Sequence, residues 1–128
     1  MSSMKEVATD MAAPAIGAYS QAIRLSDFVF TSGQLPLTPE GSIVSDDVEM
    51  QARQSMTNVS RILEAAGTTT GSIVKCTIFI TCMDDFPTVN EVYQSFLSEP
   101  YPARSTVAVG ALPKGAKVEI EAIATIGR

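Results

Sequence analysis

The chain contains no histidine and no tryptophan, and it has only two cysteines, Cys76 and Cys82. Without histidine it lacks the usual general base near neutral pH, the usual metal ligand and the base of Ser/His and Cys/His nucleophile pairs. If both cysteines lie on one strand, six residue steps separate them by roughly 20 Å, too far for an intrachain disulfide. Two reduced thiols are typical of a cytoplasmic protein.

Basic residues are also few, because 9 Lys and Arg stand against 14 Asp and Glu and give a net charge of −5. Nucleic acids are bound through basic surfaces, so no nucleic-acid partner is expected. No uncharged apolar run is long enough to span a bilayer, so no membrane partner is expected either. The first dozen residues resemble neither a secretory signal nor an arginine-rich transit peptide. The protein is therefore expected in the cytoplasm, with mitochondrial import left open.

The 128 residues, 45% of them hydrophobic, are typical of a single globular domain over residues 1–128. Asp46 and Glu49 resemble a capping box at the start of a first helix, which Gly67 ends. A second helix starts near Asp84 and ends before Pro100. The periodicity predicts elements in the order ββαβαββ, with strands at residues 20–25, 28–32, 73–81, 105–111 and 117–126.

The strand at 73–81 is apolar on both faces, with Val74, Cys76, Ile78 and Ile80 at one parity and Phe79 at the other. Two helices can cover only one face of a sheet. The pattern therefore predicts an α+β fold, a mixed sheet with two helices on one face, whose other face packs against another subunit.

Arg104 follows a proline corner, Tyr101-Pro102, and opens a β-branched run. A guanidinium is costly to bury without a partner, and its rigid donors match a carboxylate in bidentate fashion. Two interpretations stay open from the pattern alone. Arg104 either pairs with Glu119 or Glu121 of the last strand, or it binds the carboxylate of a ligand.

Six segments in order resemble the RidA (YjgF/YER057c/UK114) family: AIGAYSQA at 15–22, TSGQLP at 31–36, QARQS at 51–55, LEAAG at 63–67, PARS at 102–105 and VEIEAIA at 118–124. This resemblance implies a chorismate-mutase-like fold of the bacillus type, assembled as a homotrimer with ligand clefts between subunits. It implies hydrolysis of reactive 2-imino acids, such as 2-iminobutanoate and 2-iminopropanoate, to 2-oxo acids and ammonia. It also implies that neither metal nor cofactor is needed.

The resemblance places the carboxylate-binding arginine at Arg104 and further cleft positions at Tyr19, Ser32, Gly33 and Glu119. Glu119 is the candidate that positions the attacking water. Plainer roles remain open: Tyr19 as a rim residue, Gly33 for its backbone angles and Glu119 as a strand residue facing solvent.

Two further positions carry their own expectations. Many family members have a cysteine where this chain has Thr106, so a thiol-dependent role is excluded there, while the backbone amide can still bind a ligand. Asn90, on the exposed side of the second helix, is interpreted as a surface residue, and the alternative that it reaches the cleft from a neighbouring subunit stays open.

Two other functions stay open beside the deaminase. One is a trimer that senses 2-oxo acids without turnover. The other, disfavoured by the acidic charge and the missing histidine, is a ribonuclease that inhibits translation.

Overall fold

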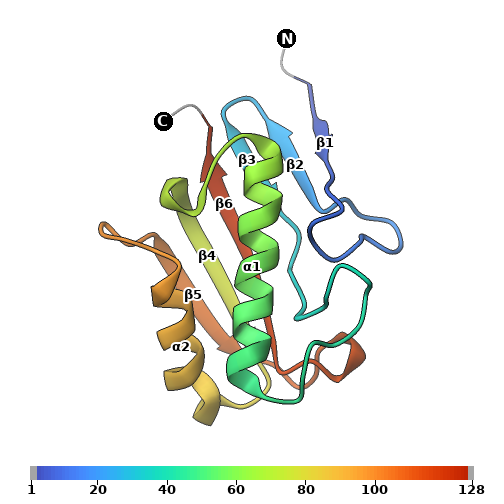
Figure 1. Ribbon diagram of the computed structural model, residues 1–128. Coiled ribbons are helices and arrows are strands. Elements are labelled where there is room, and N and C mark those ends of the chain that lie inside the picture. Colours follow the sequence, from blue (N-terminus) through green and yellow to red (C-terminus); the bar gives the residue numbers. More distant parts are fainter. Residues whose placement is uncertain (1–2, 127–128) are drawn as a thin grey trace.

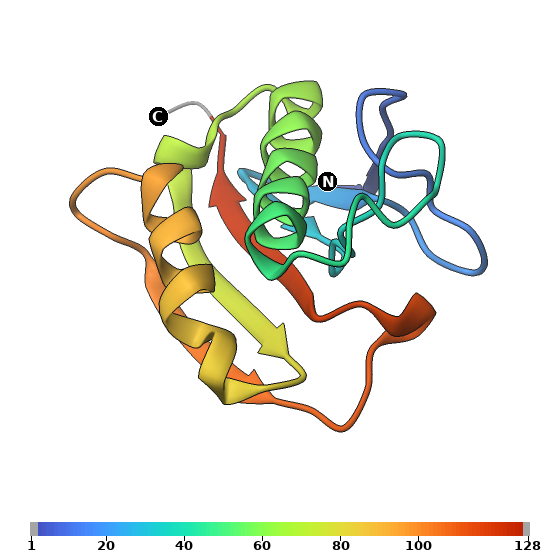
Figure 2. The same ribbon diagram turned by 60° about the horizontal axis from the view of Figure 1, so that its bottom comes forward.

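The computed structural model describes residues 3–126 and contains one six-stranded sheet with two helices on one face (Figures 1 and 2). The elements are β1 Lys5–Val7, β2 Ala22–Leu25, β3 Phe28–Thr31, α1 Val48–Ala66, β4 Ile73–Ile80, α2 Phe86–Ser95, β5 Ala103–Ala108 and β6 Val118–Thr125. The strands lie in the order β1-β2-β3-β6-β4-β5, and only β4 and β5 are parallel neighbours. The predicted α+β class and two-helix layer are confirmed.

One strand and two boundaries differ notably from the sequence prediction. The strand β1 was not predicted, because its three residues carry no apolar run and become a strand only by pairing with β2. The strand β5 covers residues 103–108 rather than 105–111, because its partner β4 offers pairing positions only from Lys75 to Ile80. The second helix stops at Ser95, ahead of the predicted proline stop.

The core lies between the helices and one face of the sheet. Along α1, Ala52, Met56, Val59 and Leu63 recur at helical spacing and are fully buried. The helix α2 adds Val89, Val92 and Tyr93. They pack against the sheet residues Val29, Cys76, Ile78, Val118 and Ile120. Neither helix of residues 3–126 has the length and apolar character that a membrane span requires.

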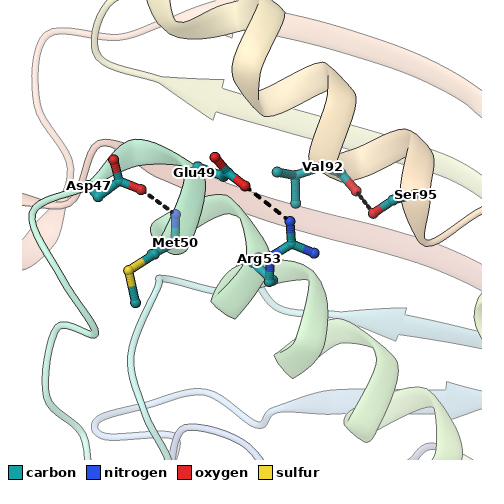
Figure 3. Close-up of polar contacts among 6 residues, drawn as sticks. All are labelled: Asp47, Glu49, Met50, Arg53, Val92 and Ser95. Carbon is teal, nitrogen blue, oxygen red and sulfur yellow. Dashed lines mark hydrogen bonds and ion pairs between the residues drawn. The ribbon is translucent and has the colours of Figure 1, made fainter.

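The cap of α1 is Asp47 rather than the predicted Asp46. Its carboxylate accepts a hydrogen bond from the Met50 amide at 3.0 Å, as Figure 3 shows. Glu49 does not close a capping box but pairs with Arg53 at 3.3 Å on the helix surface. Gly67 ends the helix as predicted, at φ 95° in the left-handed region that glycine adopts without strain.

Asp47→Ala is expected to lower the free energy of unfolding by about 1 kcal/mol, because the helix start loses its only side-chain acceptor. The matched control is Asp46→Ala, which removes the neighbouring carboxylate but no cap. Urea denaturation followed by circular dichroism measures both. Equal effects of the two substitutions would contradict the assignment of the cap.

The second face of the sheet has no helix over it among the described residues, and we call it the open face. Its side chains on β3, β6, β4 and the edge strand β5 are Phe28, Phe30, Lys75, Thr77, Phe79, Val107, Glu119, Glu121 and Ile123. Val74 was predicted to share the parity of Cys76, but a register shift between Ile73 and Lys75 leaves it 43% exposed. Packing of the open face against another subunit stays a prediction.

Candidate functional site

Arg104 lies on β5, the strand at one edge of the sheet, in register with Cys76 of β4. Paired residues of neighbouring strands point to the same side, so the exposed Arg104 side chain lies on the helix side of the sheet. Its Nη1 donates a hydrogen bond to Asn90 Oδ1 at 2.5 Å. Its Cζ lies 5.1 Å from the ring centre of Phe86 and 5.2 Å from that of Tyr93.

Phe86, Asn90 and Tyr93 occupy one side of α2, because they are spaced by four and three residues. We call these three residues the arginine seat. Two aromatic rings attract the cation and one amide oxygen fixes its orientation. Asn90 is partly exposed, as expected for a surface residue of the helix, but its side chain also binds Arg104. The spacing of the three residues on one helix side was the signal that could have revealed the seat.

Arg104 forms no ion pair with Glu119 or Glu121 within the chain, so of the two interpretations left open the structure contradicts the pairing with these residues. In register, Glu119 lies opposite Phe79 and Glu121 opposite Thr77, which puts both carboxylates on the open face. Arg104 lies on the other face, with β4 in between. Among residues 3–126 the one ion pair within 4.0 Å joins Arg53 and Glu49. The remaining N–H groups of Arg104 therefore have no carboxylate partner in the described part of the chain.

Two buried groups near Arg104, the Cys76 thiol and the hydroxyl of Tyr93 in the seat, stay uncharged. Burial raises the pKa of the Cys76 thiol to about 11, against the smaller opposing effects of Tyr93 and Arg104. Burial and the nearby Cys76 also raise the pKa of Tyr93. Cys82 is exposed just beyond β4, and both cysteines are free, as predicted. Arg104 is thus the charged group of this region. No three His, Cys, Asp or Glu residues between positions 3 and 126 are grouped to hold a metal ion.

Glu119 lies against the backbone of Gly33. A Cβ atom built on Gly33 would overlap the Glu119 carboxylate and come within 2.8 Å of its Cδ. The backbone bonds between Gln34 and Ile120, at 2.7 and 3.1 Å, hold the two segments together. Gly33 has no positive φ, so its interpretation as a residue kept for its backbone angles is wrong. It is small because Glu119 occupies the space.

Burial raises the pKa of the Glu119 carboxyl above its usual range, and the neighbouring Glu121 carboxylate adds to the rise. Both effects disfavour the charged form, since the carboxylate loses water and faces a like charge. Glu119 is half-buried rather than facing solvent freely. A carboxyl group shifted in this direction is better suited to accept a proton near neutral pH than an ordinary glutamate.

Ser32 and Tyr19 lie near Gly33. The Ser32 hydroxyl donates a hydrogen bond to the Ser20 carbonyl at 2.6 Å, which leaves its oxygen free to accept one. Tyr19 is 52% exposed. It lines, with Gly33 and Gln34, a small depression of about 20 Å³. The structure thus brings Tyr19, Gly33 and Glu119 into one region of the chain.

Thr106 lies on the helix side, and its Oγ1 is buried without a hydrogen-bond partner among residues 3–126. Its backbone N–H has a different direction. The Val109 N–H bonds to the Ile80 carbonyl of β4 at 2.8 Å. Because amide directions alternate along a strand, the Thr106 N–H points away from β4, toward the free edge of the sheet. It is therefore a donor without a partner in the sheet, on the same edge strand as Arg104.

The candidate residues fall into two groups. Arg104, Asn90 and the Thr106 amide form an edge group, and Tyr19, Ser32, Gly33 and Glu119 form a loop group. Two strand spacings and three residue steps put the Cα atoms of Arg104 and Glu119 about 14 Å apart. Their side chains also lie on opposite faces of the sheet. A single chain therefore does not bring the two groups to one small ligand.

Known proteins resemble this chain over nearly its whole length. A family model described as Endoribonuclease L-PSP matches residues 10–126. The 2-iminobutanoate/2-iminopropanoate deaminase of Salmonella typhimurium is 50% identical over 123 residues, covering 94% of this chain and 96% of the relative.

Two solved structures illustrate the likeness in fold. Escherichia coli TdcF with bound serine has a TM-score of 0.90 at 47% identity, over 96% of this chain and 99% of TdcF. RidA from an Antarctic Psychrobacter species has a TM-score of 0.91 at 44% identity, over 95% of this chain and 99% of RidA.

Proposed function

The chain belongs to the RidA/YjgF family, matched as Endoribonuclease L-PSP, and from this premise we propose that it is a 2-iminobutanoate/2-iminopropanoate deaminase. Such an enzyme hydrolyses 2-imino acids to 2-oxo acids and ammonia. The observation that carries the proposal is Arg104: an exposed guanidinium, fixed by the arginine seat, with no carboxylate partner among the described residues.

Substrate binding begins at the carboxylate. Asn90 takes one donor of Arg104, and the guanidinium keeps others for a bidentate pair with a carboxylate. The Thr106 N–H, on the same edge strand, adds a donor that does not depend on the side chain at this position. Holding the carboxylate fixes the imine carbon, which gains the rate advantage of a positioned reactant.

Hydrolysis then needs one water molecule and one acceptor. A protonated imine is already a good electrophile, so no covalent intermediate with the protein is required. Glu119 accepts a proton as the water oxygen bonds to the imine carbon. The proton returns to the nitrogen of the adduct. As the C–N bond breaks, the hydroxyl of the adduct gives its own proton to Glu119 and becomes the carbonyl, so that ammonia leaves a 2-oxo acid behind. The raised pKa of Glu119 supports this role.

In this proposal a homotrimer brings the edge group and the loop group, which lie apart within one chain, close to the same ligand. The edge group of one subunit meets the loop group of the next, so that each cleft lies between two copies of the chain. The exposed apolar side chains of the open face support self-association, with Phe28, Phe30 and Val107 each more than a third exposed. A symmetric closed assembly covers this face in every copy.

The test is an imine-trapping assay. An amino-acid oxidase generates the imine in place, and semicarbazide captures what escapes hydrolysis. We expect the protein to reduce semicarbazone formation in proportion to its concentration. A folded protein that binds 2-oxobutanoate but leaves semicarbazone formation unchanged would instead support the non-catalytic sensor. The ribonuclease alternative has the family description in its favour, while the acidic net charge and the missing histidine count against it.

The pH dependence of kcat/KM tests the role of Glu119. The base must be ionised to accept a proton, so activity falls as the pH drops through its pKa. Because that pKa is raised, the acid limb is expected above the range of an ordinary glutamate. Glu121→Gln removes one cause of the rise and should move the limb to lower pH. The control is Glu64→Gln on the surface of α1, and an unmoved limb in Glu121→Gln would contradict the assignment.

A further inference from the structure

Three polar side chains form a buried stripe along α1. Gln51, Ser55 and Asn58 recur at spacings of four and three residues, which puts them on one side of the helix. Each of them is at most 1% exposed, next to apolar positions such as Ala52 and Val59. Burying an amide is costly unless its polar atoms find partners. The partners of the two amides in this stripe therefore show what the stripe does.

Asn58 binds the backbone of the segment that follows Gly33. Its Nδ2 donates one hydrogen bond to the Leu35 carbonyl at 3.2 Å and another to the Leu37 carbonyl at 2.9 Å. Its Oδ1 accepts a hydrogen bond from Gln54 Nε2 at 3.0 Å, which fixes the orientation of the amide. The connection between β3 and α1, which contains this segment, runs beside α1 in both views (Figures 1 and 2). Asn58 thus fastens an irregular segment to the helix.

Gln51 fastens the start of β6 to the same helix. Its Oε1 accepts a hydrogen bond from the Lys117 N–H at 2.8 Å, and its Nε2 donates one to the Ser45 carbonyl at 2.8 Å. Lys117 lies two residues before Glu119 in the chain. The helix α1 is therefore a common support for the segment after Gly33 and for the strand that carries Glu119.

The two supported segments meet at the Glu119 carboxylate. Gly33 lies against this carboxylate, so that a Cβ atom at position 33 would overlap it. The backbone bonds between Gln34 and Ile120 join the two segments to each other. A group held on a buried helix is positioned more precisely than one held on a loop alone. The place of Gly33 relative to Glu119 therefore depends on the bonds that Asn58 makes.

We propose that Asn58 is a positioning residue of the deaminase, which holds Gly33 against Glu119 and so keeps the proton acceptor in its working orientation. The inference rests on the proposed function, in which Glu119 accepts a proton. Because Asn58 is fully buried, it acts through the backbone and does not touch the substrate. A small misplacement of a reacting group lowers the rate of a step that depends on alignment.

Asn58→Leu tests this role, because it keeps a branched side chain of similar shape and removes both donors. We expect kcat for 2-iminobutanoate to fall about tenfold, with KM changed by less than about twofold. The acid limb of kcat/KM should also move to lower pH. A loosened segment admits water to Glu119, and burial is the main cause of its raised pKa. The semicarbazide assay, repeated across the pH range, measures all three quantities.

The charges around Glu119 stay the same in this variant. On β3, β4, β5 and β6, the open face has two other charged side chains, Glu121 and Lys75. Residues 32–37 have no titratable side chain. A shift of the acid limb in Asn58→Leu therefore reports the hydration of the Glu119 carboxyl and not a changed neighbour.

The matched control is Val59→Ala, at the next position of α1. It lowers stability by opening a cavity in the core, but it removes no bond to the segment after Gly33. Its kcat should stay within about twofold of wild type, with an unmoved acid limb. If both variants of an active protein showed the same kcat and the same limb, Asn58 would be merely structural and the inference would fail alone. A wild-type protein without deaminase activity would overturn the proposed function as well.

A milder variant keeps the test decisive if Asn58→Leu does not fold. Gln54→Met, at a partly exposed position, removes the donor that orients the Asn58 amide and leaves Asn58 itself in place. Its kcat should fall about threefold, with the acid limb moved in the same direction. In that case a folded Gln54→Met with wild-type kcat and an unmoved limb would overturn the inference.

Discussion

Arg104→Ala is expected to lower kcat/KM for 2-iminobutanoate by at least about 100-fold, equivalent to about 3 kcal/mol of lost transition-state binding. In the proposed site, the substitution removes a bidentate charge-assisted partner of the substrate carboxylate. The carboxylate is bound in the ground state as well as in the transition state, so most of the loss should appear as a higher KM. Initial rates in the semicarbazide assay, over a range of imine concentrations, measure both constants.

Two further variants control for charge and for folding. Arg104→Lys keeps the cation but loses the planar fork, so its activity should lie between wild type and Arg104→Ala. Arg53→Ala removes an exposed arginine of α1 whose one ion pair is with Glu49, and it should retain full activity. If a folded Arg104→Ala kept activity within tenfold of wild type, the substrate carboxylate would have to bind elsewhere.

Mixing two inactive variants is expected to restore activity. Glu119→Gln should lose about 100-fold in kcat, because the proton acceptor is gone while the shape remains. If each site combines Arg104 of one copy with Glu119 of the next, a mixed trimer contains intact sites. A site is intact when the subunit that supplies Arg104 is the Glu119→Gln variant and the subunit that supplies Glu119 is the Arg104→Ala variant. In an equal mixture each of these two conditions holds for half of the subunits. Equal amounts, unfolded together and refolded, should therefore regain about one quarter of wild-type activity.

The mixing experiment has a sharp contrary outcome. A site built within one chain is damaged in every subunit of the mixture, so no activity would return. Each variant refolded alone provides the baseline, and size-exclusion chromatography with light scattering reports whether mixed trimers formed. Mixed trimers without restored activity would contradict a site shared between subunits.

Much of the fold could be predicted from local pattern. The β-branched run at 73–80 and the glycine stop at position 67 determine their elements through short-range physics. The strand β1 could not be predicted, because Lys5, Glu6 and Val7 have no strand pattern of their own and depend on pairing with β2. Asp46 and Asp47 are adjacent cap candidates of equal chemistry in the sequence, and only the hydrogen bond from the Met50 amide identifies Asp47 as the cap.

The site was harder to predict, because alternation within a strand does not say how two strands are aligned. Parity correctly grouped Arg104 with Thr106, and Glu119 with Glu121. Parity could not predict the register of these strands against β4. The first pair is aligned with Cys76 and Ile78 on one face of the sheet, and the second pair with Phe79 and Thr77 on the other face. That register arises from the whole sheet. The contact of Asn90 with Arg104 likewise depends on where α2 packs.

The close approach of Gly33 to Glu119 has an entropic consequence. With backbone on one side, the glutamate side chain has fewer rotamers open to it before any ligand arrives. In the proposed reaction, less conformational freedom is then lost when Glu119 binds water, so part of the ordering cost is met on folding. The missing side chain at position 33 lets the backbone approach the carboxylate at position 119 closely enough to restrict it.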